Sequence, residues 1–331
     1  MPEISVIIPV YNKCGYLDNL WKELIQQSFH DFECIIVDDG STDGSGDKCN
    51  EIADKDGRFK AIHIDNGGVS HARNVALDCA CGKYVTFIDA DDSIHPDYLQ
   101  NLYDGIVTHE VDMVISSSLR VWKDSPKSIS IDVPFYGKKA QYEIMPTFVK
   151  NQTTSGIYGF CWGKMVKREI IGETRFDESI NLAEDLDFYL SIYPKIRMLF
   201  FDDHHYYYYL QEAENSSMQK EDWEYDYYVQ LKIQLKMRNM IEKMGFLNPE
   251  NDMLAASRIW DYAFFVIYYS RREDIRTMCC RVRALQLQGI RCRLRERPFR
   301  QVLVLTLFLM RLDDMIELFL ITLRRLKKAT Y

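Results

Sequence analysis

The feature of this sequence that most constrains its fold is a regular alternation of short apolar runs and amphipathic helical patterns over the first hundred residues. The apolar runs predict strands at Ile4–Val10, 34–37, 60–64 and 84–88. Helical patterns separate them at 16–27, 46–54 and 70–79. Strands separated by helices of this length are typical of an α/β protein with a parallel sheet flanked by helices.

Polar residues directly follow three of these predicted strands. They are Tyr11 and Asn12 after the first strand, Asp38 and Asp39 after the second, and Asp89 to Asp92 after the fourth. Ligands of parallel α/β sheets bind at the carboxyl ends of the strands, which lie along one edge. We therefore expect these side chains to meet in one binding site.

The segment Asp89-Ala90-Asp91-Asp92 offers carboxylates one residue apart at a strand end. Such carboxylates can hold one Mg²⁺ or Mn²⁺ ion, which bridges the diphosphate of a nucleotide-sugar and stabilises the departing charge. A helix predicted from about Asp97 leaves a second interpretation open, in which the acidic residues cap that helix.

The segment VDDGSTDGS, from Val37 to Ser45, places acidic and small residues after a buried strand. These residues can reach a nucleotide base and ribose, because glycine allows close backbone approach. An Asx-rich turn before the next helix is the alternative. The segment also resembles the opening of an EF-hand loop, but Asn50 stands at the twelfth position, where that loop needs Glu, so we exclude calcium.

Two further segments have both a functional and a purely structural interpretation. Gly67 and Gly68 form a tight turn into a helix that carries Arg73, which either pairs with phosphate or base or is solvated. Glu184 and Asp185 begin an aromatic-rich helix, whose N-terminus favours ionised carboxylates. They are either candidates for a general base or ordinary N-terminal helix charges.

Together SVIIPVYN, VDDGSTDGS, GGVSHARNVAL, YVTFIDADD and AEDLDFYL, in this order and spacing, resemble family 2 of the inverting nucleotide-sugar glycosyltransferases. The resemblance covers about residues 4–215. It implies a GT-A fold, in which a Rossmann-like, mostly parallel sheet is flanked by helices. It also implies a hexosyl- or N-acetylhexosaminyl-transferase of surface glycan and polysaccharide biosynthesis. Such an enzyme uses Mn²⁺ or Mg²⁺ and, with Asp39 at this position, a UDP-sugar.

The resemblance implies roles for individual residues. Asp185 would deprotonate the acceptor hydroxyl, with Glu184 as the alternative base, and Asp91 would ligate the metal. The nucleotide-binding residues would be Pro9, Tyr11, Asn12, Asp39, Arg73, Asp89 and Ala90. Among these, Tyr11 would pack on the nucleobase, Asp39 would hydrogen-bond it, and Asp89 would contact the ribose. Arg73 would lie near base or phosphate, and Trp162, in FCWGKMV, would line the acceptor side.

The chain departs from many relatives after the Glu184–Asp185 pair, where it reads HHYYYYLQEAENSS. His204 or His205 is here either a third metal ligand or ordinary strand sequence. The remaining pattern up to this point predicts strands at 111–116 and 198–201, a loop or hairpin at 123–142 and a helix at 182–193.

A helical region of residues 221–331 is expected after a catalytic region of residues 1–220, with Pro249 and Pro298 as breaks between helices. Residues 271–331 carry 15 Lys and Arg against 6 Asp and Glu, a balance of +9. The apolar face spanning Leu303–Leu326 either lies on an anionic membrane surface or packs within the protein or a homo-oligomer. The continuous apolar run at 302–310 is too short to cross a bilayer.

Composition narrows the class of protein. The first 270 residues carry a net charge of −17, which argues against nucleic-acid binding. Nine cysteines without zinc spacing, and no signal peptide, predict reduced thiols and a cytoplasmic protein, at the inner membrane face if the tail binds lipid. The expected partners are a nucleotide-sugar donor and a glycan, lipid-linked or protein acceptor. The alternative function is a catalytically silent nucleotide-sugar-binding scaffold of a glycan assembly complex.

Overall fold

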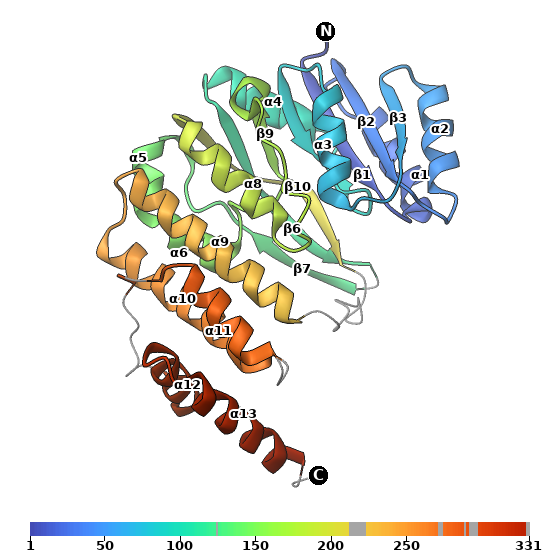
Figure 1. Ribbon diagram of the computed structural model, residues 1–331. Coiled ribbons are helices and arrows are strands. Elements are labelled where there is room, and N and C mark those ends of the chain that lie inside the picture. Colours follow the sequence, from blue (N-terminus) through green and yellow to red (C-terminus); the bar gives the residue numbers. More distant parts are fainter. Residues whose placement is uncertain (124, 212–222, 271–273, 288, 291–296, 329–331) are drawn as a thin grey trace. The chain divides into compact units, whose positions relative to one another are not determined.

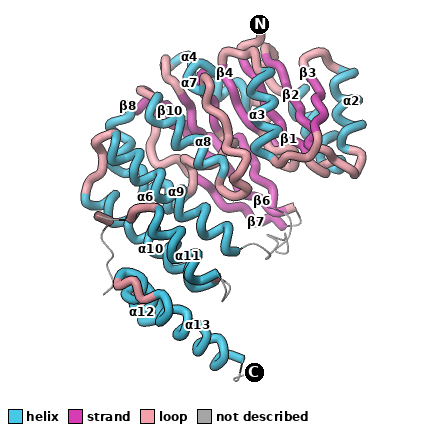
Figure 2. The backbone as a smooth tube through the Cα atoms, viewed as in Figure 1, coloured by secondary structure: helices cyan, strands magenta, loops and turns pink. Residues whose placement is uncertain are grey.

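The computed structural model describes the chain except for residues 124, 212–222, 271–273, 288, 291–296 and 329–331 (Figure 1). Contacts divide the chain into two compact units, Met1–Ser216 and Ser217–Tyr331. The first unit is built around one mixed sheet, and the described part of the second contains helices and loops (Figure 2). The predicted α/β class with a helical C-terminal region is confirmed.

The sheet runs in the order β3-β2-β1-β4-β9-β6-β10-β5, with β7 beside β6 and β8 beside β10. Its strands are β1 (Ile4–Val10), β2 (Phe32–Asp39), β3 (Phe59–Ile64), β4 (Tyr84–Phe87), β5 (Ser93–Ile94), β6 (Met113–Trp122), β7 (Ser125–Ile131), β8 (Gly137–Ala140), β9 (Lys164–Lys167) and β10 (Met198–Gln211). The four strands β1 to β4 pair in parallel, whereas β9 is antiparallel to β4 and β6. The carboxyl ends of β1 to β4 consequently share one edge.

The helices of the first unit flank this sheet (Figure 1). They are α1 (Cys14–Ile25), α2 (Ser45–Lys55), α3 (Val69–Cys79), α4 (Tyr98–Thr108), α5 (Gln141–Ile144), α6 (Phe148–Ser155), α7 (Arg168–Ile171) and α8 (Glu184–Ile192). In α1 the buried residues Leu17, Leu20 and Leu24 recur at helical spacing, which gives the helix one apolar face. The central strand β1 is almost wholly buried because helices cover both faces of a parallel sheet. Helix α3 packs on β1 and β2.

The elements predicted for the first hundred residues all form. The region 123–142, expected as a loop or hairpin, contains β7, which pairs with β6, and β8, which pairs with β10. The strand predicted at 198–201 was too short, because β10 continues to Gln211. Its register with β6 shifts between Asp202 and Tyr207. Beyond this bulge the tyrosine run returns to the sheet, and Tyr207 is fully buried.

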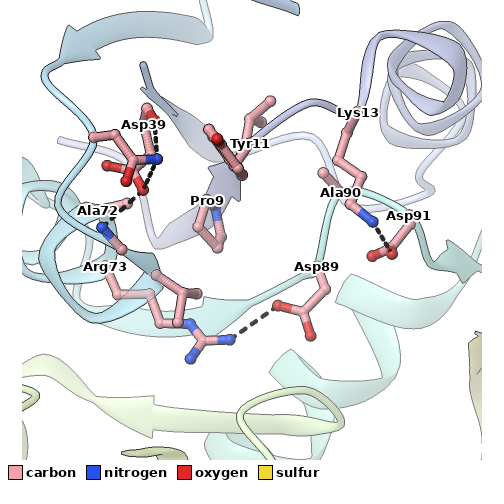
Figure 3. A pocket seen from close by; sticks show the side chains of 13 residues that line it. Pro9, Tyr11, Lys13, Asp39, Ala72, Arg73, Asp89, Ala90 and Asp91 are labelled. Carbon is pink, nitrogen blue, oxygen red and sulfur yellow. Dashed lines mark hydrogen bonds and ion pairs between the residues drawn. The ribbon is translucent and has the colours of Figure 1, made fainter. Parts of the chain in front are cut away.

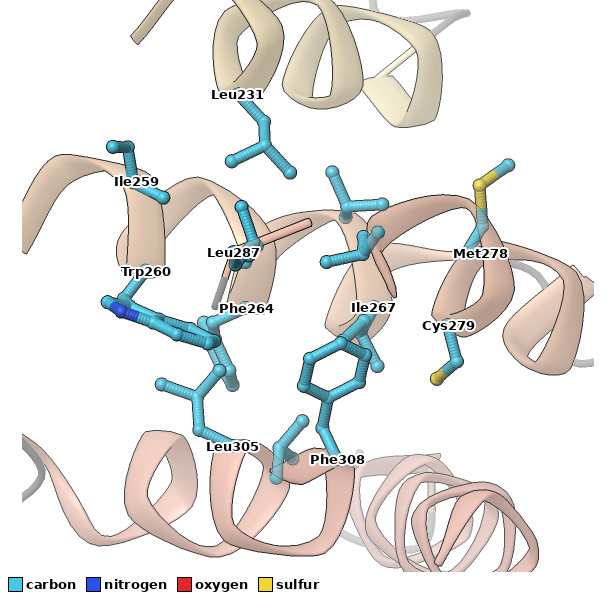
Figure 4. Close-up of a cluster of buried hydrophobic side chains, with 14 of the residues drawn as sticks. Leu231, Ile259, Trp260, Phe264, Ile267, Met278, Cys279, Leu287, Leu305 and Phe308 are labelled. Atoms are coloured by element: carbon cyan, nitrogen blue, oxygen red, sulfur yellow. The ribbon is translucent and has the colours of Figure 1, made fainter. Parts of the chain in front are cut away.

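The second unit consists of α9 (Trp223–Lys243), α10 (Pro249–Tyr269), α11 (Ile275–Ala284), α12 (Phe299–Leu309) and α13 (Asp313–Lys328) in the part that the structure describes. Pro249 is the first residue of α10, whose cap Asn248 accepts the Asn251 N–H at 2.8 Å, and Pro298 caps α12. Both predicted breaks are confirmed. The five helices share an apolar core that includes Trp260, Phe264 and Phe308 (Figure 4).

The apolar face expected to span Leu303–Leu326 is divided between two helices. The chain breaks between α12 and α13, where Arg311 takes a left-handed backbone conformation with φ 60°. This conformation ends an α-helix. The side chain of Leu326 lies outside the described residues.

Candidate active site

The carboxyl ends of β1, β2 and β4 open onto one cavity of about 450 Å³ in the first unit (Figure 3). Its walls come from the polar segments after these strands and from the start of α3. The lining residues are Pro9, Val10, Tyr11, Lys13, Asp39, Asn66, Gly68, Val69, Ala72, Arg73, Asp89, Ala90 and Asp91. Every residue predicted to bind nucleotide except Asn12 therefore lines one cavity, together with the predicted metal ligand Asp91.

Asp39, at the end of β2, joins two of the loops that form this cavity. Its side chain is almost fully buried, and its two carboxylate oxygens accept the N–H groups of Gly67 at 2.7 Å and Gly68 at 2.9 Å. The loops lie so close that a Cβ on Gly40, which has φ +69°, would come 2.8 Å from the backbone nitrogen of Asn66. Only glycine meets both conditions. Asp39 thus shapes the cavity wall as well as facing it.

Asn12 links the loop after β1 to the loop after β2. Its backbone is left-handed, with φ 50°. Its Oδ1 accepts the Thr42 N–H at 2.9 Å, and its own N–H donates to Ser41 Oγ at 2.9 Å. The neighbouring Tyr11 is 50% exposed, and an exposed ring on a cavity wall offers a stacking face. Asn12 therefore holds the loop that presents Tyr11.

Two carboxylates of the segment after β4 pair with cations at the cavity (Figure 3). Asp89 Oδ1 lies 3.0 Å from an Arg73 guanidinium nitrogen, and Asp91 Oδ2 lies 2.5 Å from Lys13 Nζ. The Lys13 and Asp91 side chains are each 35% exposed, so Asp91 is open to a cation from solvent. Lys13 is not among the predicted site residues, although its position directly after Tyr11-Asn12 places it near the site.

Asp92 is engaged differently from its two neighbours. It is buried, its Oδ2 accepts the Tyr207 hydroxyl at 2.6 Å, and its Oδ1 accepts the Leu210 N–H at 2.8 Å. Burial raises the pKa of Asp92. Asp92 therefore ties this loop to β10. Helix α4 begins only at Tyr98, with Asp97 as its cap, so the capping interpretation of the acidic segment is wrong.

Glu184 and Asp185 form the first turn of α8, after Ala183 in a left-handed conformation with φ 57°. Glu184 Oε1 accepts a hydrogen bond from Arg73 at 2.8 Å. Asp185 Oδ1 accepts the Leu186 N–H at 2.7 Å. Burial, reinforced by the negative charge of Glu184, raises the pKa of Asp185 to about 7, although the Arg73 charge opposes this shift. A carboxylate with this pKa can exchange a proton near neutral pH.

Lys164, which is not among the predicted site residues, is buried. It is 1% exposed, its ammonium donates to the Phe160 carbonyl, and its Nζ lies 5.1 Å from the centre of the Tyr189 ring. Burial lowers the pKa of Lys164 to about 7, although the Cys161 thiol and Asp185 oppose this shift.

Trp162, predicted on the acceptor side, is 4% exposed. Its ring stacks on Phe160, Tyr207 and Tyr209, with centroids at 4.3, 5.1 and 5.5 Å. Arg120 lies over the outer face of this stack, 5.6 Å from the centre of the Tyr209 ring. Trp162 thus packs inside an aromatic stack that β10 shares with the loop before β9.

The two histidines of β10 pair with other carboxylates. His204 Nδ1 lies 2.7 Å from Asp202, and His205 Nε2 lies 2.8 Å from Asp132. Asp202, Asp203 and His204 bring possible ligand atoms within 4.8 Å of one another. Asp202 Oδ2 already accepts a hydrogen bond from the Asn101 amide at 2.5 Å. A cluster of acidic residues is not by itself a metal site.

Residues 5–171 match the model of glycosyl transferase family 2, which is half of the chain. The chain belongs to glycosyl transferase family 2. It is 34% identical over 190 residues to the glycosyltransferase GlyA of Streptococcus pneumoniae serotype 4, and 29% identical over 206 residues to a cholesterol galactosyltransferase of Borreliella burgdorferi. Those stretches cover 55% and 60% of this chain, but only 27% and 57% of the two relatives.

The fold of this family 2 member also has counterparts among solved structures. Residues 1–349 of S. aureus TarS in complex with UDP-GlcNAc align with a TM-score of 0.60 over 87% of this chain and 88% of that one, at 21% identity. This likeness supports the GT-A fold that the sequence motifs imply.

Proposed function

We propose that this family 2 protein is an inverting, metal-dependent glycosyltransferase that moves a sugar from a UDP-sugar to an acceptor hydroxyl. The observation that carries the proposal is the meeting of four sequence segments around one cavity, joined by Arg73 to the Glu184–Asp185 pair. Tyr11 and Asp39 would bind the base, and Asp89 the ribose. The pKa of Asp185, about 7, supports an enzyme over a catalytically silent scaffold.

The residues present fit a divalent cation at Asp91. Carboxylate oxygens are preferred ligands of Mg²⁺ and Mn²⁺. The Asp91 carboxylate is partly exposed and already attracts the Lys13 ammonium, whereas both oxygens of Asp92 are occupied. A bound ion would offset negative charge on the leaving diphosphate. Asp91 would hold it and Lys13 would be released toward the cavity.

Asp185 would act as the general base. Its ionised carboxylate would take the proton of the acceptor hydroxyl as the oxygen attacks the anomeric carbon from the side opposite the diphosphate. Glu184 is less suited, because its carboxylate already accepts a hydrogen bond from Arg73 at 2.8 Å. We assign residues 1–220 to sugar transfer and residues 221–331 to attachment of the protein to a membrane surface.

The nucleotide preference tests the proposal directly. We expect UDP with Mn²⁺ to raise the melting temperature more than GDP, CDP or dTDP, because a ligand that binds only the native state stabilises it. Asp39→Ala should weaken UDP binding by about 1–3 kcal/mol, since it leaves polar groups of the base and of the loop unpaired. Asp65→Ala, an exposed neighbour, should bind as the unaltered protein does. Equal binding of UDP and GDP would contradict the assignment.

The second unit supports a peripheral membrane role. In the described part of the chain no helix is long and apolar enough to span a bilayer. Helices α12 and α13 bury one face in the core of the unit, yet Phe299 of α12 and Leu318 of α13 are 76% and 67% exposed, and Met310, directly after α12, is 62% exposed. Together with the balance of +9 in residues 271–331, these side chains suit an anionic cytoplasmic leaflet, where lipid-linked acceptors would diffuse.

Co-sedimentation with phosphatidylglycerol vesicles tests this attachment. We expect the protein to pellet at low salt and to be released at high salt, since each Lys or Arg near the surface contributes about 1 kcal/mol. The double variant M310E/L318E should lose pelleting, whereas M253E, 38% exposed on α10, should keep it. These point changes are preferable to truncation, which would remove core residues such as Leu305 and Phe308. No pelleting, with dimerisation lost in M310E/L318E by light scattering, would instead indicate a homo-oligomer.

A further inference from the structure

Arg73 is a buried cation that connects two parts of the site. It is 4% exposed, and its terminal nitrogens donate to Asp89 at 3.0 Å and to Glu184 at 2.8 Å. Asp89 belongs to the loop that lines the nucleotide cavity, and Glu184 belongs to the first turn of α8. The guanidinium carbon also lies 5.4 Å from the centre of the Phe176 ring.

The next residue of α3 strengthens this connection. Asn74 donates to the Phe176 carbonyl at 3.0 Å and accepts the Phe176 N–H at 2.8 Å, so it grips the segment before α8 from both backbone groups. The Phe176 ring stacks on Phe188 of α8, with centroids 4.0 Å apart. Helix α3 thus holds both the approach to α8, through Asn74, and its first turn, through Arg73.

The start of α8 needs such support. Ala183, which precedes Glu184, has φ 57°, a conformation that is unfavourable for residues other than glycine and persists only where surrounding contacts impose it. Within the described residues, the Glu184 side chain is held to the rest of the protein by Arg73. Moving Glu184 would move Asp185, which follows it.

We propose that Arg73 is a positioning residue for Asp185: by holding Glu184 against Asp89 it sets the place and the charge environment of the base. This inference rests on the proposed role of Asp185. It differs from the expectation that Arg73 contacts the nucleotide, because each terminal nitrogen of Arg73 already donates a hydrogen bond to a carboxylate. The Nε of Arg73 is buried and has no hydrogen-bond partner among the described residues.

The charges around Asp185 predict the direction in which its pKa should change in each variant. The groups that influence it are Glu184, Arg73, Lys164 and Cys161. Arg73 lowers the pKa of Asp185, whereas Glu184 raises it. Removing the charge of Arg73 should therefore raise this pKa, and removing the charge of Glu184 should lower it.

The experiment compares the unaltered protein with Arg73→Gln, Arg73→Lys and Glu184→Gln. We expect Arg73→Gln to lower kcat on the order of 10²-fold, the effect of misplacing a catalytic group by about 1 Å, with UDP affinity by calorimetry nearly unchanged. The acid limb of kcat should move to higher pH in Arg73→Gln and to lower pH in Glu184→Gln. Arg73→Lys, which keeps the charge, should restore the pH profile toward that of the unaltered protein. Thermal unfolding verifies that each variant is folded.

A second measurement separates this proposal from the proposed function. Carboxyl ¹³C NMR titration follows Asp185 directly, and it needs no turnover. Shifts of the Asp185 pKa in opposite directions in Arg73→Gln and Glu184→Gln would support the positioning role. If the protein then accepted no donor sugar, that failure would count against the proposed function and not against the positioning role. Loss of UDP affinity in Arg73→Gln with kcat retained at saturating donor would overturn the positioning role in favour of a donor contact. Unshifted titrations in both variants would overturn it as well.

Discussion

Replacing Asp185 with Asn should lower kcat by about 10²–10⁴-fold while UDP affinity stays nearly unchanged. Asparagine keeps the size of the side chain and can still accept the Leu186 N–H that Asp185 binds at 2.7 Å. It cannot take the proton of the acceptor hydroxyl. In the unaltered protein the base works only when ionised, so kcat should fall as the pH drops through about 7, the pKa of Asp185. That acid limb should be absent from the residual activity of Asp185→Asn.

Two further variants make the assignment specific. Glu184→Gln should lose less activity than Asp185→Asn, because Glu184 serves Arg73 rather than the acceptor. Asp187→Asn changes another acidic residue of the first turn of α8 and should retain most of the turnover. Steady-state kinetics with saturating UDP-sugar across pH 5–9 would check all three. A larger loss in Glu184→Gln than in Asp185→Asn would mean that the two roles are exchanged.

The pattern of the first hundred residues predicted the sheet well because each element depends on local sequence. The short, β-branched apolar run Ile4–Val10 forms a strand that is buried on both faces, and the polar segments directly follow the strand ends. Sheet topology then brings segments 28 to 80 residues apart to one edge, so Tyr11, Asp39 and Asp91 meet at the cavity as the motif order suggests.

Other features could not be predicted, because they depend on contacts between distant residues. Arg73 and Glu184 are 111 residues apart, and no local pattern pairs them. The length of β10 is decided by its partner β6 and by the Tyr207–Asp92 bond, not by its own mixed sequence of aspartates, histidines and tyrosines. Likewise, no local pattern pairs Lys13 with Asp91, yet the Lys13 Nζ lies 2.5 Å from the Asp91 carboxylate.

Replacing Asp91 with Ala should abolish detectable transfer while the fold remains intact. Asp91 is partly exposed after the end of a strand, and its carboxylate contacts the half-buried Lys13 ammonium, so its loss leaves no fully buried charge there. The variant removes the carboxylate that we assign to the divalent cation. Metal stabilisation of a leaving group contributes several kcal/mol, and about 4 kcal/mol corresponds to roughly 10³-fold in rate.

Metal dependence can be separated from a general loss of charge by three comparisons. Asp91→Asn keeps the shape of the side chain and should be as inactive as Asp91→Ala, because a neutral amide is a poor ligand for Mn²⁺ or Mg²⁺. Asp104→Ala removes an exposed carboxylate on α4 and should leave turnover unchanged. Calorimetry should show that Mn²⁺ strengthens UDP binding to the unaltered protein and not to either Asp91 variant. If the unaltered protein keeps its full turnover in EDTA, the cation has no part in the reaction, and Asp91 must act through Lys13 alone.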